Sequence, residues 1–192
     1  MKTNTDFTSK EITKSSAYQI ALIGIMAAIT CILGPLSIPI PFSPVPISFT
    51  NLAIYLTAFI LGWKRGTISY FIYLLIGLVG LPVFSGFSGG PGKLFGPTGG
   101  YLIGFIFMAL ISGYFIEKFN GKLFMSILGL ILATFAAYLL GTGWLAYQAN
   151  LTFWQALMAG VIPYLIGDGI KIALAAIVGP ILKSRLLRAN LI

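Results

Sequence analysis

The sequence predicts an all-α integral membrane protein with six transmembrane helices and both termini in the cytoplasm. Three observations support this prediction: an apolar composition, a division into six apolar runs, and a one-sided distribution of basic residues. Of the 192 residues, 58% are hydrophobic and only 8% are charged, whereas a soluble domain carries about 25% charged residues. Because so few charged groups cannot cover a water-facing surface, we expect the chain to be embedded in a lipid bilayer.

The polar side chains exclude several kinds of site. The chain has no histidine, which is the usual general base and the commonest metal ligand. Its four carboxylates are too few for a metal cage or a paired-carboxylate site. They are Asp6, Glu11, Glu117 and Asp168. We therefore expect no enzyme activity and no metal or other cofactor.

Six apolar runs are each expected to cross the bilayer. They cover about residues 18–36, 47–61, 67–83, 99–116, 123–147 and 153–183. The second and third are short for a spanning helix, which needs about 20 residues, and short or broken spans often border a binding cavity in transporters. Residues 1–192 are expected to form a single membrane domain, with a cytoplasmic tail at 1–17 and a glycine-rich outward loop at 84–98.

Six spans would place ten of the 12 basic residues on one side of the membrane. These ten are Lys2, Lys10, Lys14, Lys64, Arg65, Lys118, Lys122, Lys183, Arg185 and Arg188. By the positive-inside rule this side is the cytoplasm. The same rule accounts for the net charge of +8, so a nucleic-acid partner is not expected. Only Lys93 and Lys171 depart from the pattern.

Asp168 and Lys171 lie inside the last apolar run, three residues apart and therefore on one face of a helix. A charge at mid-membrane costs about 3 kcal/mol or more, so two charges persist there only if they are paired or face a polar cavity. A structural ion pair, a proton relay and a ligand clamp all satisfy this condition. The clamp is favoured, because a carboxylate accepts N–H bonds and an ammonium donates to a carbonyl or binds a carboxylate.

Residues 85–100 contain seven glycines and Lys93. Glycine lets the backbone approach a ligand closely, and successive free N–H groups form anion-binding concavities. This segment is either a flexible outer turn or a lid over a small solute. At its end Thr98 is expected to cap the fourth span, so that Gly99 and Gly100 lie open to a ligand beside Tyr101.

The first outward connection, residues 35–48, has five prolines. Proline removes backbone donors and stiffens an extended chain, so this segment is expected to form a rigid wall or a capping loop. Ser48, Thr50 and Asn51 follow it. They either cap the second span or face the same cavity as Asp168.

Four segments together resemble a known family. They are Pro44-Val-Pro-Ile-Ser, Gly80-Leu-Pro-Val-Phe-Ser-Gly, Gly96-Pro-Thr-Gly-Gly-Tyr and Gly167-Asp-Gly-Ile-Lys171. This combination resembles the BioY family, the biotin-specific substrate-binding (S) components of bacterial energy-coupling factor transporters, over nearly the whole chain from about residue 18. Thr50 and Asn51 stand where the family often has a glutamine, and Asn51 can substitute for it.

The resemblance implies a six-helix S-component fold in the bacterial plasma membrane and high-affinity capture of biotin from outside. It also implies a transmembrane coupling protein and two cytoplasmic ATP-binding subunits as partners. Small residues on the first helix, spaced for close helix contact, would dock on the coupling protein or else pack within the bundle. They are Ala17, Ala21, Gly24 and Ala28. The alternatives are an S component for thiamine or riboflavin, a membrane-embedded enzyme, or an ion channel.

Biotin suits the polar residues that the resemblance assigns to binding. Asp168 can accept the two N–H groups of the ureido ring while Lys171 donates to its carbonyl; the opposite orientation would place the biotin carboxylate on Lys171. The other expected contacts are Tyr101, Phe84 and Trp144 for the bicyclic body, Lys93 for the carboxylate, and Gly99, Gly100, Ser85 and Asn51 around them.

Overall fold

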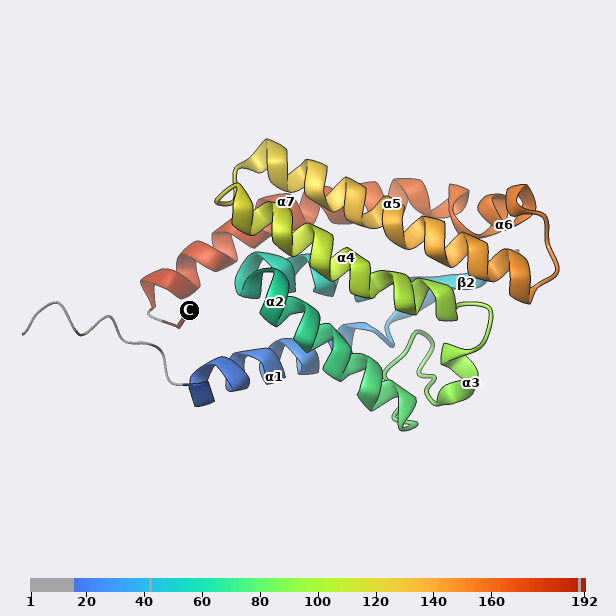
Figure 1. Cartoon of the computed structure of the whole chain (residues 1–192), viewed down its shortest axis with the longest axis horizontal. Helices are drawn as coiled ribbons and strands as arrows, with labels where there is room; N and C mark the ends of the chain where they lie inside the picture. The colour runs from blue at the N-terminus through green and yellow to red at the C-terminus, as the bar shows by residue number, and fades with distance from the viewer. Residues whose placement is uncertain (1–15, 42, 190) are drawn as a thin grey trace, which may run out of the picture.

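The computed structural model describes residues 16–41, 43–189 and 191–192, which form an elongated bundle of helices (Figure 1). The helices are α1 (Ser16–Leu33), α2 (Thr50–Leu78), α3 (Pro91–Leu94), α4 (Gly99–Lys118), α5 (Leu123–Gln148), α6 (Phe153–Gly160), the 3-10 helix η1 (Ile162–Tyr164) and α7 (Leu165–Arg188). Two strands, β1 (Ser37–Ile40) and β2 (Ser43–Ser48), lie between α1 and α2. Residues 1–15 of the expected cytoplasmic tail, with Lys2, Lys10 and Lys14, lie outside the described residues.

The described residues include three helical stretches long and apolar enough to cross a bilayer. They are Gly99–Lys118, Leu123–Gln148 and Phe153–Arg188, and Ala17–Leu33 is a shorter apolar helix. Large apolar side chains point outward from these helices, such as Phe135, 61% exposed, and Ile166, 80% exposed. An outer surface of this kind suits lipid rather than water, so the protein is a helical membrane protein.

The predicted second and third spans are joined directly within α2, which is broken at Gly62. Gly62 has φ 73° and ψ −166°, a conformation that glycine adopts without steric penalty. The parts before and after the break run in different directions (Figure 1). After the break the second part of α2 begins, and the first N–H groups of a helix have no partner within it. The side chain of Glu117 in α4 accepts one of them, the N–H of Trp63, at 3.3 Å. The expected connection at residues 62–66 is therefore helical apart from one glycine.

The last predicted span is also broken, between α6 and α7. A capping box begins α6: the Thr152 hydroxyl accepts the Gln155 N–H at 3.3 Å, and the Gln155 side chain accepts the Thr152 N–H at 2.9 Å. After Gly160 the chain passes through η1, which contains Pro163, a residue that cannot donate a backbone hydrogen bond. This irregular stretch lets α7 start anew, with Asp168 in its first turn.

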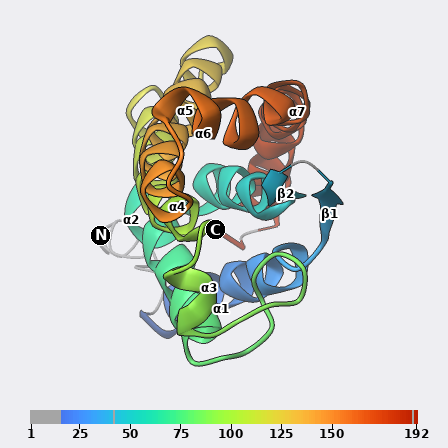
Figure 2. The same cartoon turned by 90° about the vertical axis from the view of Figure 1, so that its right-hand side faces the viewer.

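The proline-rich connection forms an antiparallel hairpin. The sequence predicted an all-α fold, and this hairpin is an exception to it. Ser37 pairs with Ser48, and Ile38 pairs with Ile47. Each strand of a two-stranded ribbon has a free edge, where a residue without an N–H group is tolerated, and the prolines of β1 and β2 are accommodated in this way. The hairpin contacts α6 and forms a wall at the side of the bundle below α7 (Figure 2).

Helices α4 and α5 pack side by side along most of their length (Figure 1). Their close approach depends on glycines: a Cβ at Gly100 would lie 2.2 Å from the Cβ of Trp144, and one at Gly104 would lie 2.9 Å from the Cα of Ala137. Glycine pairs of this spacing bring membrane helices together. Gly99 is equally enclosed, because a Cβ there would lie 1.7 Å from the carbonyl oxygen of Leu94. The expectation that Gly99 and Gly100 lie open to a ligand is therefore wrong as a matter of packing.

Candidate binding site

A buried ion pair lies at the centre of the candidate site. The Nζ atom of Lys171 is 3.0 Å from Oδ1 of Asp168, and it is the only ion pair between described residues. Both residues are buried, at 6% and 8% exposure. An ion pair removed from water is stable only if further hydrogen bonds satisfy its remaining lone pairs and protons.

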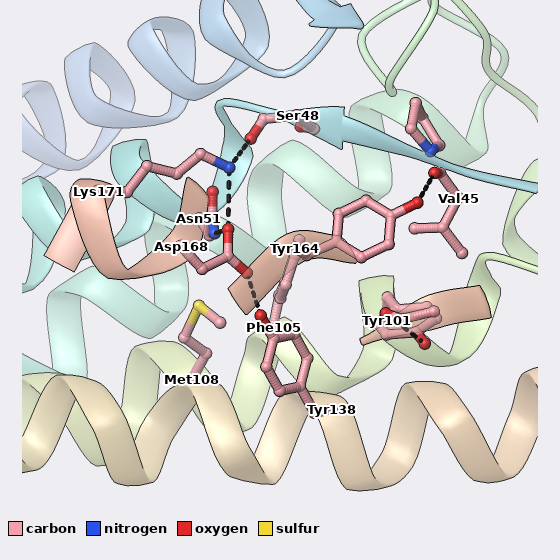
Figure 3. Close-up of a pocket in the computed structure, with 12 residues that line it drawn as sticks. Val45, Ser48, Asn51, Tyr101, Phe105, Met108, Tyr138, Tyr164, Asp168 and Lys171 are labelled. Atoms are coloured by element: carbon pink, nitrogen blue, oxygen red, sulfur yellow. Dashed lines mark hydrogen bonds and ion pairs between the residues drawn. The ribbon is translucent and has the colours of Figure 1, made fainter. Parts of the chain in front are cut away.

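Neighbouring helices and the hairpin supply these hydrogen bonds (Figure 3). The Asn51 amide donates to Oδ1 of Asp168 at 2.8 Å, and the Tyr138 hydroxyl donates to Oδ2 at 2.5 Å. Lys171 also donates to the backbone carbonyl of Ser48 in β2 at 2.6 Å. The first turn of α7 favours a negative charge as well, because the helix dipole is positive there. Four elements, α2, α5, α7 and β2, thus hold the pair in one geometry.

Each partner of the ion pair keeps one hydrogen-bonding position free. A carboxylate has about four lone-pair sites and an ammonium has three protons. Asp168 accepts from Asn51, Tyr138 and Lys171, while Lys171 donates to Asp168 and Ser48. One acceptor site and one donor therefore remain. This pattern fits a ligand that presents an N–H group next to a carbonyl or carboxylate oxygen.

Asp168 and Lys171 line a cavity of about 60 Å³ between β2, α2, α4, α5, α6, η1 and α7. Most of its lining is apolar or aromatic, as in typical small-molecule sites. The lining residues are Val45, Pro46, Ser48, Asn51, Tyr101, Phe105, Met108, Tyr138, Gly160, Tyr164, Asp168 and Lys171. The cavity can hold a few water molecules, so a ring system enters only if one wall moves outward.

Two tyrosines tie the walls of the cavity together. The Tyr101 hydroxyl of α4 donates to the carbonyl of Gly160 at the end of α6, at 3.0 Å. The Tyr164 hydroxyl in η1 contacts both the Ser43 hydroxyl, at 2.8 Å, and the carbonyl of Val45 in β2. The irregular segment between α6 and α7 is thereby attached to α4 on one side and to the hairpin on the other.

Four of the predicted binding residues meet at the cavity although they are distant in sequence: Asn51, Tyr101, Asp168 and Lys171. The other six do not line it. They are Phe84, Ser85, Lys93, Gly99, Gly100 and Trp144. The structure therefore unites the polar centre of the predicted site and separates it from the glycine-rich loop.

The six other residues have structural contacts of their own. Phe84 is fully buried, with its ring centroid 5.5 Å from that of Tyr73. The Trp144 indole N–H donates to the Gly96 carbonyl at 2.9 Å and so fastens the glycine-rich loop to α5. In the loop, the Ser85 carbonyl accepts from the Ser88 hydroxyl at 2.8 Å.

The remaining loop residues also differ from expectation. Lys93 lies in the short helix α3, where desolvation lowers the pKa of its ammonium group. Thr98 does stand at the N-cap of α4, as predicted, but its side chain makes no capping hydrogen bond. Neither residue reaches the cavity.

Sequence reasoning missed Tyr138 and Tyr164. Tyr138 lies among apolar residues of α5 and gives no signal of its own, because its role depends on α7 lying opposite. Tyr164 had a usable signal: it directly follows Pro163, and irregular backbone within a membrane is tolerated where it lines a cavity or is buried in protein.

The four small residues of α1 lie on the outside of the bundle. Ala17, Ala21, Gly24 and Ala28 are all exposed, and a Cβ built at Gly24 would meet no atom within 4 Å. The structure therefore does not support the alternative that these four residues pack within the bundle. Their exposed faces leave room for another helix.

Comparisons with known proteins agree on one family. The model of the BioY family matches residues 3–188. The probable biotin transporter BioY of Pyrococcus horikoshii is 35% identical over 84% of this chain and 94% of that protein. The biotin transporter BioY2 of Lactococcus lactis is 33% identical over 90% and 94%, and the biotin transporter BioY of Thermotoga maritima is 36% identical over 86% and 95%.

The fold is also similar to a solved structure, described as the S-component for biotin from an ECF-type ABC transporter. The TM-score is 0.81 at 32% sequence identity, and the match covers 88% of this chain and 92% of the other. A family match over nearly the whole sequence, full-length relatives above 30% identity and a shared fold lead to the same conclusion: the chain belongs to the BioY family.

Proposed function

We propose that this chain is the biotin-binding S component of an energy-coupling factor transporter. The observation that carries the proposal is the buried Asp168–Lys171 pair, which faces a cavity with one acceptor site and one donor free. The relatives named as biotin transporters and the similar biotin S-component supply the identity of the ligand. The chain captures and releases its ligand and catalyses no reaction, so it needs no cofactor.

Biotin matches the free positions of the ion pair. In one orientation one ureido N–H group donates to the free acceptor site of Asp168, and the ureido carbonyl accepts from Lys171. The rings of Tyr101, Tyr138 and Phe105 then provide the apolar walls for the bicyclic body. In the opposite orientation Lys171 binds the valerate carboxylate. In either case a wall of the cavity moves outward to admit the ring system and closes over it afterwards.

The proposed topology has six spans with both termini in the cytoplasm of a bacterial cell. The spans are α1, the two parts of α2, α4, α5, and α6 together with α7. The C-terminus and the start of α1 lie at one end of the bundle, while β2 and the glycine-rich loop lie at the other (Figure 1). Basic residues such as Lys64, Lys122 and Arg188 favour the cytoplasm for the first end, which places the cavity on the outer side of the plasma membrane.

Biotin binding by the purified chain tests the proposal. We expect tight binding without ATP or partner subunits, measured by calorimetry and by the melting temperature. At a ligand concentration 100 times the Kd, binding stabilises the folded state by about 2.7 kcal/mol. Thiamine and riboflavin serve as controls. If thiamine or riboflavin raises the melting temperature and biotin does not, the chain is specific for that vitamin and the proposal of biotin uptake is wrong.

The expected partners are a transmembrane coupling protein and two cytoplasmic ATP-binding subunits, and the exposed small residues of α1 are the proposed docking face. Ala21→Trp should prevent assembly with the coupling protein, because a large side chain blocks close helix approach, while biotin affinity stays unchanged. Co-purification with the coupling protein measures assembly. Leu139→Trp on α5, at a site 53% exposed, is the matched control and should assemble normally. Assembly of the Ala21→Trp variant at the wild-type level would reject this docking face.

A further inference from the structure

Two hollows adjoin at the end of the bundle that carries the C-terminus, away from the binding cavity. The first, which we call the basic hollow, has a volume of about 310 Å³. It is lined by Ile60, Leu61, Gly62, Lys64, Arg65, Ile116, Glu117 and Lys183. The second, the apolar groove, has a volume of about 390 Å³. It is lined by Tyr18, Ala21, Leu22, Ile25, Met26, Ile29, Leu56, Ile60, Leu182, Leu186 and Leu191.

The basic hollow has more positive than negative charge. It gathers Lys64, Arg65 and Lys183 around a single carboxylate, Glu117, which accepts the N–H of Trp63. Among the described residues, none of these three cations forms an ion pair. Like charges brought together in a partly enclosed space repel one another, and a bound anion removes that repulsion. A phosphate group would match this arrangement of donors.

The apolar groove fits a hydrocarbon chain. It runs between α1 and α7, with Leu56 and Ile60 of α2 at its base. Near the C-terminus it is bounded where the Tyr18 hydroxyl donates to the carbonyl of Leu191. Ile25 is 55% exposed, so the groove is open along its outer side, which faces the bilayer. The groove therefore presents an apolar surface against which an acyl chain can pack.

The two hollows are neighbours. Ile60 lines both, and Leu182 in the groove is followed directly by Lys183 in the hollow. We propose that together they bind one anionic phospholipid, with its phosphate among Lys64, Arg65 and Lys183 and one acyl chain in the apolar groove. A free phosphate would leave the groove unused, and an uncharged lipid would leave the cations uncompensated. This site is separate from the biotin cavity and goes beyond the proposed function; because Ala21 lines the groove and also belongs to the proposed docking face, the lipid and the coupling protein would compete for this side of α1.

Lipid binding to the purified chain, without coupling protein, tests the site. Native mass spectrometry gives the Kd for phosphatidylglycerol, with phosphatidylcholine as the neutral comparison and inorganic phosphate as the comparison without a chain. We expect a clear preference for phosphatidylglycerol over both. Lys64→Gln with Lys183→Gln should weaken phosphatidylglycerol binding about fivefold for each charge removed. Lys118→Gln with Lys122→Gln removes two cations that do not line the hollow and should change the Kd little.

A second variant separates the groove from the hollow. Ile25→Trp fills the groove from an exposed position and keeps every cation, so it should weaken phosphatidylglycerol binding without affecting biotin binding. Unchanged biotin affinity in all variants shows that they are folded. Equal binding of the two phospholipids, equal losses in the two lysine pairs, or competition by inorganic phosphate at similar concentration would each overturn the proposal. So would phosphatidylglycerol binding that the Ile25→Trp variant leaves unchanged.

Discussion

Asp168→Asn is expected to weaken biotin binding by at least about 100-fold, because truncating one partner of a buried, hydrogen-bonded charge pair typically costs 2–5 kcal/mol or more. The substitution replaces one carboxylate oxygen by an NH2 group, so Asn51 and Tyr138 no longer each have an acceptor oxygen, and it leaves the Lys171 ammonium buried without a counter-charge. It should also lower the melting temperature of the ligand-free protein. Calorimetry measures the affinity, and thermal unfolding in detergent measures the stability.

A second variant distinguishes ligand binding from structural pairing. Asp168→Asn combined with Lys171→Met removes both charges, and replacing a buried pair by uncharged groups is often neutral for stability. We expect this double variant to recover most of the lost melting temperature while biotin binding remains absent. Recovery of near wild-type affinity together with stability would mean that the pair only packs the bundle. The clamp interpretation would then have to be abandoned.

Gly100→Ala is expected to lower the melting temperature by about 5 °C, since forcing a methyl group into a filled contact costs about 1–3 kcal/mol. The added Cβ would lie 2.2 Å from the Cβ of Trp144 and 3.0 Å from the carbonyl oxygen of Leu140, so α4 and α5 must move apart. Thermal unfolding without ligand measures the effect. Biotin affinity of the folded fraction should stay within a few-fold of wild type, because Gly100 does not line the cavity.

Gly143→Ala is the matched control on the facing helix, since a Cβ at Gly143 would meet no atom within 4 Å. This variant should melt at or above the wild-type temperature, because alanine is the better helix former. If the Gly100→Ala protein keeps its stability but loses biotin binding, Gly100 contacts the ligand, as the sequence had suggested. That result would contradict the packing role.

The sequence was informative where it places a residue type in surroundings that are energetically unfavourable for it, such as a charge within an apolar run. Asp168 and Lys171 are conspicuous inside an apolar run, and their spacing predicted a shared helix face, on which the structure places them 3.0 Å apart. The membrane class followed from composition for a similar reason. Such conclusions need no knowledge of which helices are neighbours.

Features that depend on long-range neighbours were beyond sequence reasoning. The glycines that follow Thr98 suggested a ligand contact, because nothing in the local sequence shows that Trp144 occupies the adjacent space. Tyr138 looked like any aromatic residue of a membrane helix until α7 placed Asp168 beside it. The hairpin segment was expected only as a rigid wall or a capping loop, since its five prolines mask the alternation that marks a strand.

The two oxygens of the Asp168 carboxylate are not equivalent. Oδ1 receives two donors, from Asn51 and Lys171, whereas Oδ2 receives one, from Tyr138. An sp² oxygen accepts two hydrogen bonds readily, so the unoccupied lone pair belongs to Oδ2. An incoming N–H group must therefore approach the carboxylate at Oδ2, on the side where the Tyr138 hydroxyl already donates.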